Sequence, residues 1–154
     1  MKLFPEKTHL LRLNQQPEAA LERLKRQTEY SERLVSQRTS KSFIGSIHGN
    51  QFSLISSAIG SGAFCALNGS VTENEVQVDV SINKPFRIIL GIFLAFPLVA
   101  LLTMFAGPGE GHAWMNLIVV AIQLLMIRFV FIELAFRYFS KHSLARLYNV
   151  MDIE

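Results

Sequence analysis

The sequence predicts an α+β membrane protein, and three observations support this class. Half of the 154 residues are hydrophobic and only 18% are charged, against roughly 25% charged residues in average soluble proteins. Two long apolar stretches lie between residues 86 and 136. Residues 43–82, which precede them, alternate between apolar and polar side chains, as strands do. This distribution excludes a soluble globular protein, a disordered chain and a disulfide scaffold.

The first elements are an extended segment and a helix. Residues 8–13 have the pattern of a short extended segment. A helix is expected to begin at Pro17, because proline followed by an acidic residue is typical of a first helical turn. Apolar residues then recur on one helical face as far as Gln27, and the pattern allows the helix to continue to Val35. Residues 36–42 are expected to form a linker or the end of the helix.

A sheet is expected to follow, because the hydrophobic period changes to two. Residues 43–47 and 52–54 alternate on either side of a Gly-Asn turn, which predicts a hairpin. Residues 65–71 alternate in the same way, and residues 76–82 form the clearest amphipathic strand of the chain. We therefore predict an N-terminal helix plus a four- or five-stranded antiparallel meander, arranged as a small barrel or a PH-like sheet.

Two transmembrane helices are predicted next, at about 86–106 and 114–136, with an outer loop at 107–113. Each is long enough for a hydrocarbon core of about 30 Å. Pro97 predicts a kink in the first helix. Leu, Ile, Phe and Val contribute about −0.3 to −0.6 kcal/mol each, so together they outweigh the roughly +2.5 to +3.5 kcal/mol cost of the arginine in the second helix.

These elements divide the chain into a cytoplasmic α+β domain (1–85), a transmembrane hairpin (86–139) and a cytoplasmic tail helix (140–154). Eleven of the 15 Lys and Arg residues lie at or before Arg87, and the loop between the two spans contains none. The positive-inside rule then predicts that both termini are cytoplasmic. The lipid bilayer is the first expected partner.

Three short motifs carry a resemblance. Residues 43–47 (FIGSI), 50–54 (NQFSL) and 67–71 (LNGSV) are followed by an alternating valine strand and two spans. This order resembles a loose group of small bacterial inner-membrane proteins, uncharacterised in function, with a small PH-like or barrel-like sheet joined to a two-helix transmembrane hairpin. The likeness covers most of the chain and implies the fold and a bacterial inner-membrane location, without implying an activity. The sequence departs from the pattern at residues 64–66, where a proline is expected.

No residue pattern in the sequence indicates catalysis. The four histidines are far apart and lack metal-ligand spacing, and the glycines of residues 60–62 are not followed by the lysine of a phosphate loop. Cys65, the single cysteine, falls on the expected core face of its strand. A net charge of +3 is too small to indicate a nucleic-acid partner. We therefore expect a protein that is not an enzyme and has no cofactor or metal.

Three groups of residues are candidates for interaction. Polar residues inside the second span are candidates for helix pairing or for lining a pore, and Arg128 is expected either to reach the headgroups or to pair with another helix or subunit. Small residues and a proline in the first span are candidates for helix packing, and basic residues are candidates for contact with lipid headgroups. The intramembrane polar residues are Gln123, Arg128 and Glu133; the helix-packing residues are Gly91, Ala95 and Pro97; the headgroup residues are Arg23, Lys25, Arg26, Lys84, Arg87, Arg137 and Lys141.

Two functions are compatible with these features. The first is a membrane-anchored interaction or adaptor module whose cytoplasmic β domain binds itself or a partner protein. The alternative is a membrane effector that senses a cytoplasmic signal and oligomerises through its spans into a leak or pore, as in bacterial defence or toxin systems. Both predict a homo-oligomer or a complex with a membrane or cytoplasmic protein.

Overall fold

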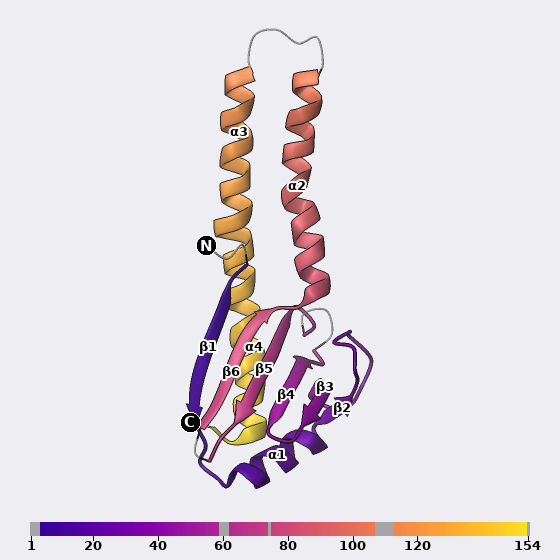
Figure 1. Cartoon of the computed structure of the whole chain (residues 1–154), viewed down its shortest axis with the longest axis vertical. Coiled ribbons are helices and arrows are strands. Elements are labelled where there is room, and N and C mark those ends of the chain that lie inside the picture. Colours follow the sequence, from indigo (N-terminus) through magenta and orange to yellow (C-terminus); the bar gives the residue numbers. More distant parts are fainter. Residues whose placement is uncertain (1–3, 59–61, 74, 107–112, 154) are drawn as a thin grey trace. The chain divides into compact units, whose positions relative to one another are not determined.

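The computed structural model describes residues 4–58, 62–73, 75–106 and 113–153 (Figure 1). The chain divides into two compact units. The sheet unit combines Met1–Asn83 with Phe136–Glu154, and the helical unit is Lys84–Ala135. The helical unit is therefore an insertion within the sheet unit, which is built from segments on both sides of it.

The sheet unit contains a six-stranded sheet in the order β1-β6-β5-β4-β3-β2. Strands β3 to β6 are antiparallel neighbours in sequence order, as the alternating residues predict. The strands are β1 (Glu6–Arg12), β2 (Thr28–Tyr30), β3 (Phe43–His48), β4 (Gln51–Ser56), β5 (Cys65–Val71) and β6 (Glu75–Ile82).

The sheet differs from the predicted meander in three respects. It has six strands instead of four or five, because both the extended N-terminal segment and a three-residue segment after the first helix join it. It is mixed, since β2 pairs in parallel with β3. It is also open, because β1 and β2 occupy opposite edges and do not pair with each other in the described residues. These differences arise from long-range pairings, such as Thr28 with Phe43, that hydrophobic alternation does not encode.

The core lies between one face of the sheet, the inner face, and two helices. Helix α1 (Pro17–Arg26) buries Leu21 and Leu24, which repeat at helical spacing. Helix α4 (Ile132–Met151) enters the sheet unit at Phe136 and lies along the sheet (Figure 1). Alternate side chains of β6 are buried on the inner face, and the side chains between them are more exposed. The buried residues of α4 within the sheet unit include Phe136, Leu144, Leu147 and Met151.

The opposite, outer face of the sheet is apolar at one end only. Ile44, Ile55 and Ala66 form a small buried cluster there, and Leu34 and Ala63 pack against it. Nearby, the Asn83 side-chain amide donates to the carbonyls of Leu34 at 2.8 Å and of Ala63 at 3.0 Å. These bonds tie two connecting segments to the residue at which the chain leaves the sheet unit.

The helical unit contains two helices that are long and apolar enough to cross a membrane. One is α2 (Lys84–Ala106), which continues through Pro97. The other is a continuous helical stretch of α3 (Ala113–Leu125), a π-helical segment η1 (Met126–Phe131) and α4. Their most apolar windows have mean hydropathies of 2.3 and 2.4, and only 6% and 11% of the residues in them are buried. Core helices of a soluble protein are mostly buried, so this exposure agrees better with a lipid environment.

Candidate functional site

The candidate site is built from two rows of polar side chains on the outer face of the sheet. Strands β3 to β6 each contribute one residue to each row, and strand register places neighbours in a row directly opposite one another. Successive residues on one face of a strand are two apart, so both rows face the same way. The first row is Ser46, Ser53, Asn68 and Asp79; the second row is His48, Gln51, Ser70 and Gln77.

These eight side chains line an open concavity of about 390 Å³, together with Phe52 and Gly69. The volume falls within the range of about 300–1,000 Å³ that is typical of small-molecule sites. Such sites are usually lined by apolar side chains. Here the lining consists mainly of hydroxyl and amide groups, so the chemistry available is hydrogen bonding.

Gly69 shapes the sheet under the concavity. Phe52 is its partner in register on β4, and a Cβ atom built on Gly69 would lie 2.4 Å from Cζ of the Phe52 ring. The same Cβ atom would lie 2.5 Å from the backbone oxygen of Gln77. Only glycine therefore leaves room for the ring of Phe52, which is buried.

Hydrogen bonds orient the first polar row. The Ser53 hydroxyl donates to Oδ1 of Asn68 at 2.7 Å, which turns the amide NH₂ group of Asn68 away from Ser53. The Thr8 hydroxyl, from β1, donates to Oδ1 of Asp79. Asn68 and Asp79 are opposite each other in register. An amide donor and a carboxylate acceptor are thus held side by side before any ligand arrives.

The lining carries little charge. Asp79 is the single acidic residue in it, and neither Lys nor Arg lines the concavity. Among the described residues there is also no group of three or more His, Cys, Asp or Glu side chains able to hold a metal ion. Cys65 lies on the inner face, where burial raises the pKa of its thiol to about 12. The thiol of Cys65 is therefore not part of the concavity, and neither Lys nor Arg is present in the lining to pair with an anion.

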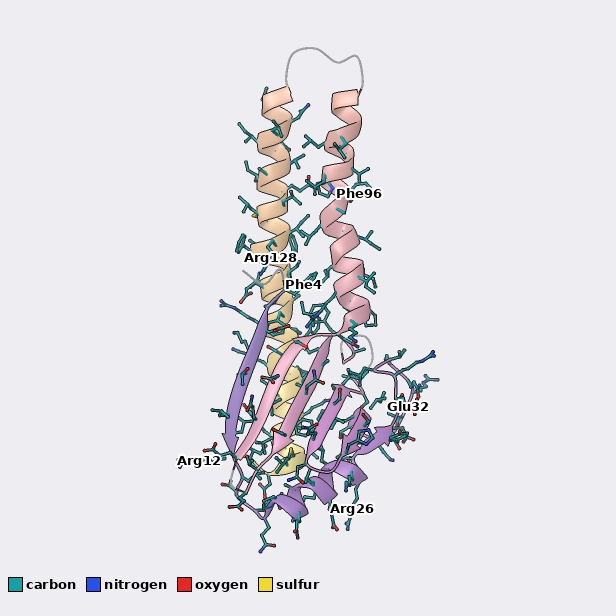
Figure 2. The ribbon with its side chains drawn as sticks, viewed as in Figure 1. Phe4, Arg12, Arg26, Glu32, Phe96 and Arg128 are labelled. Atoms are coloured by element: carbon teal, nitrogen blue, oxygen red, sulfur yellow. The ribbon has the colours of Figure 1, made fainter. Side chains whose placement is uncertain are left out.

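The predicted intramembrane polar residues lie in or beside the π-helical segment. Gln123 is exposed on α3, and Glu133 is half-buried at the start of α4. Arg128 is half-buried inside η1 (Figure 2). Its Cζ atom lies 5.3 Å from the ring centroid of Phe129. Their roles in pairing or in pore lining stay predictions.

The predicted helix-packing residues of α2 differ in their burial. A Cβ atom built on Gly91 meets no atom within 4 Å, and Ala95 is exposed. Pro97 is buried, whereas its neighbour Phe96 is 72% exposed (Figure 2). Gly91 and Ala95 therefore stay candidates for contact with another chain.

The predicted headgroup residues fall into two separate groups. Arg23, Lys25 and Arg26 are exposed on α1, which follows the end of the sheet where Arg12 pairs with Glu75. Glu75 is the first residue of β6 and Ile82 is its last, so this end of the sheet is about 25 Å from the end at which the chain leaves the sheet unit. The second group is close in sequence to the junctions with the helical unit: Lys84, Arg87, Arg137 and Lys141.

Sequence reasoning did not select the residues of the concavity. Alternation identifies the polar face of each strand, but only strand register shows that four strands align their polar residues in two rows. One signal in the sequence is composition. The segment from Ser46 to Ser70 contains no Lys, Arg, Asp or Glu, and the polar positions of its strands carry Ser, Asn, Gln and His.

Comparisons with protein families, with curated proteins and with solved structures found no match to this chain. The resemblance to the small inner-membrane group therefore has support only from the sheet and the two apolar helices.

Proposed function

We propose that this protein is a membrane-anchored interaction module, in which the helical unit spans a bacterial inner membrane and the sheet unit binds itself or a partner protein in the cytoplasm. In this role the protein binds and does not catalyse a reaction. It assigns the two units different tasks: attachment to the bilayer and recognition.

The observation that carries the proposal is the construction of the sheet unit from both sides of the helical unit. Because Met1–Asn83 and Phe136–Glu154 fold together, the proposal requires both ends of the sheet unit to lie on one side of the membrane that the helical unit crosses. Two crossings satisfy this requirement. The excess of Lys and Arg in the segments outside the spans favours the cytoplasmic side.

Strand β1 is the surface that we assign to partner binding. It lies at an edge of the sheet, and the opposite edge strand, β2, has only three residues. Exposed edges of this kind pair readily with a strand of another chain. Leu10, near the middle of β1, is 69% exposed on the outer face. Beyond β1, Leu13 is already paired with Ile153, so we assign the partner to β1 itself, around Leu10.

The test is to extract the tagged full-length protein from its native membrane in mild detergent. Light scattering measures the mass of the complex, and mass spectrometry identifies the chains that co-purify. Leu10→Arg places a charge on the open edge, and Val35→Arg is the matched control, because Val35 is an exposed apolar residue of a connecting segment.

We expect a homo-oligomer or a stoichiometric complex with one foreign protein. Leu10→Arg should lower the yield of that complex, and Val35→Arg should leave it unchanged. A monomer without partners would refute the proposal. Equal yields of the complex from Leu10→Arg and Val35→Arg would show that β1 is not the surface that binds the partner.

A second candidate function is a membrane leak or pore, and the π-helical segment is the observation that favours it. Segments of this kind occur frequently at functional sites, and η1 contains Arg128. Arg128→Leu separates the two functions: a pore loses its conductance in liposomes while insertion persists, whereas an anchor keeps its complex and inserts at least as well.

A further inference from the structure

We propose that the concavity formed by the two polar rows is a binding site for a neutral saccharide. This site lies on the outer face of the sheet, whereas the protein partner is assigned to the β1 edge. The inference therefore goes beyond the proposed function and does not depend on it.

The lining first argues against anionic and apolar ligands. A phosphate or carboxylate ligand finds neither Lys nor Arg in the lining and meets the carboxylate of Asp79. An apolar ligand finds no exposed apolar side chain, because Phe52 is only 3% exposed. A ligand that gains from this surface must be rich in hydrogen-bonding groups and must not be an anion.

The first row then favours hydroxyl groups in particular. Each hydroxyl is both a donor and an acceptor, whereas the amide NH₂ group only donates and an ionised carboxylate only accepts. Asn68 presents its NH₂ group beside the carboxylate of Asp79, and both are already oriented by Ser53 and Thr8. Two neighbouring hydroxyls of a sugar ring can satisfy this donor and acceptor together.

The extent of the rows agrees with an oligosaccharide. Neighbouring strands are about 4.8 Å apart, so the four strands β3 to β6 give rows of about 14 Å. The second row lies about 7 Å from the first and adds the amides of Gln51 and Gln77. An extended peptide would be expected instead at a strand edge, where backbone groups are unpaired. On the face of the sheet a ligand meets mainly side chains, rather than the unpaired backbone groups of a strand edge.

The arrangement is also unlike an ordinary solvated sheet face. The chain contains 27 Lys, Arg, Asp and Glu residues, of which one lines the concavity. Ser and amide side chains, which occupy most of the two rows, contribute little to solubility compared with charges. Their concentration in a hollow of about 390 Å³ is explained by a polar ligand.

The test uses the full-length protein in lipid nanodiscs, because maltoside and glucoside detergents carry the proposed ligand chemistry. The probe is an array of neutral, amino and acidic oligosaccharides. Binding of the best neutral saccharide is then titrated calorimetrically. Asn68→Asp replaces the amide donor by a second carboxylate, and Asp79→Asn replaces the carboxylate by a second amide, both with little change in size. The double variant restores one amide and one carboxylate in the reverse order. Ser81→Ala is the control on the same face of β6, outside the concavity.

We expect a neutral saccharide to bind and each single variant to weaken its affinity about tenfold. The double variant should recover part of the loss, and Ser81→Ala should bind like the parent protein. If Asn68→Asp does not fold, Ser53→Ala, which removes the bond that orients Asn68, should weaken binding instead.

Two results would overturn the inference. One is the absence of neutral saccharide binding above protein-free nanodiscs. The other is equal affinity in the parent, Asp79→Asn and Ser53→Ala proteins. Neither result changes the complex mass on which the proposed function is tested.

Discussion

Removal of residues 136–154 is expected to unfold the sheet unit, although every strand precedes them. The truncation removes the part of α4 that covers the inner face. Four apolar side chains of that part are at most 6% exposed: Phe136, Leu144, Leu147 and Met151.

The size of the effect follows from this burial. Burying a large apolar side chain stabilises a fold by about 1.5–3 kcal/mol, so four of them contribute roughly 6–12 kcal/mol. A domain of about 100 residues has a free energy of unfolding of roughly 5–15 kcal/mol. The loss is therefore comparable with the whole stability of the sheet unit. A single change, Leu147→Ala, should cost about 2–5 kcal/mol.

The assay compares two chains that both lack the helical unit. One is residues 1–83, and the other is residues 1–83 joined by a long Gly/Ser linker to residues 136–154. Circular dichroism follows unfolding in urea. We expect one cooperative transition in the joined chain and none in the chain of residues 1–83. Asn149→Ala, an exposed change on the same helix, is the control for Leu147→Ala and should shift stability by no more than about 0.5 kcal/mol.

A cooperative transition of residues 1–83 at the same urea midpoint as the joined chain would refute this reasoning. It would mean that the strands and α1 form a complete core, and that α4 only lies against it.

Three further predictions concern single residues. Gly69→Ala should lower the free energy of unfolding by about 1–3 kcal/mol, measured by urea unfolding, because the added methyl group meets the ring of Phe52. Asn83→Ala should cost roughly 1–3 kcal/mol in the same measurement, since two side-chain hydrogen bonds are lost. The thiol of Cys65 should resist maleimide at pH 8 in the folded protein and react after unfolding, because burial raises its pKa from 9.0 to about 12. The folded state binds the thiol proton more tightly, so the contribution of Cys65 to stability is present below pH 9.0 and is lost as the pH rises towards 12. Cys65→Ala should flatten the dependence of the free energy of unfolding on pH in this range.

Local patterns predicted the elements whose contacts are close in sequence. The β3–β4 hairpin follows from alternation around Gly49-Asn50, and Gly49 has a positive φ of 58°, as such a turn requires. The two apolar helices follow from composition. A start at Pro17 follows from proline placement, and α1 begins there.

Long-range pairings could not be predicted in this way. The segment Thr28–Tyr30 has no alternation of its own, and its parallel partner is fixed by contacts with Phe43–Gly45. The π-helical segment depends on backbone hydrogen bonding that no residue in Met126–Phe131 signals. The concavity required the register of four strands, so its residues were visible in the sequence only as separate polar positions.

The insertion of the helical unit also fixes the order of events during synthesis. The strands are complete at Ile82, but Met151 emerges only after the helical unit has been translated. At about 5–20 residues per second, the 69 residues from Asn83 to Met151 take roughly 3–14 s. During this interval α1 is available to the inner face of the sheet, but the part of α4 that covers it is not. If the proposed membrane insertion of the apolar helices occurs in this interval, the protein is attached to the bilayer before its sheet unit is complete.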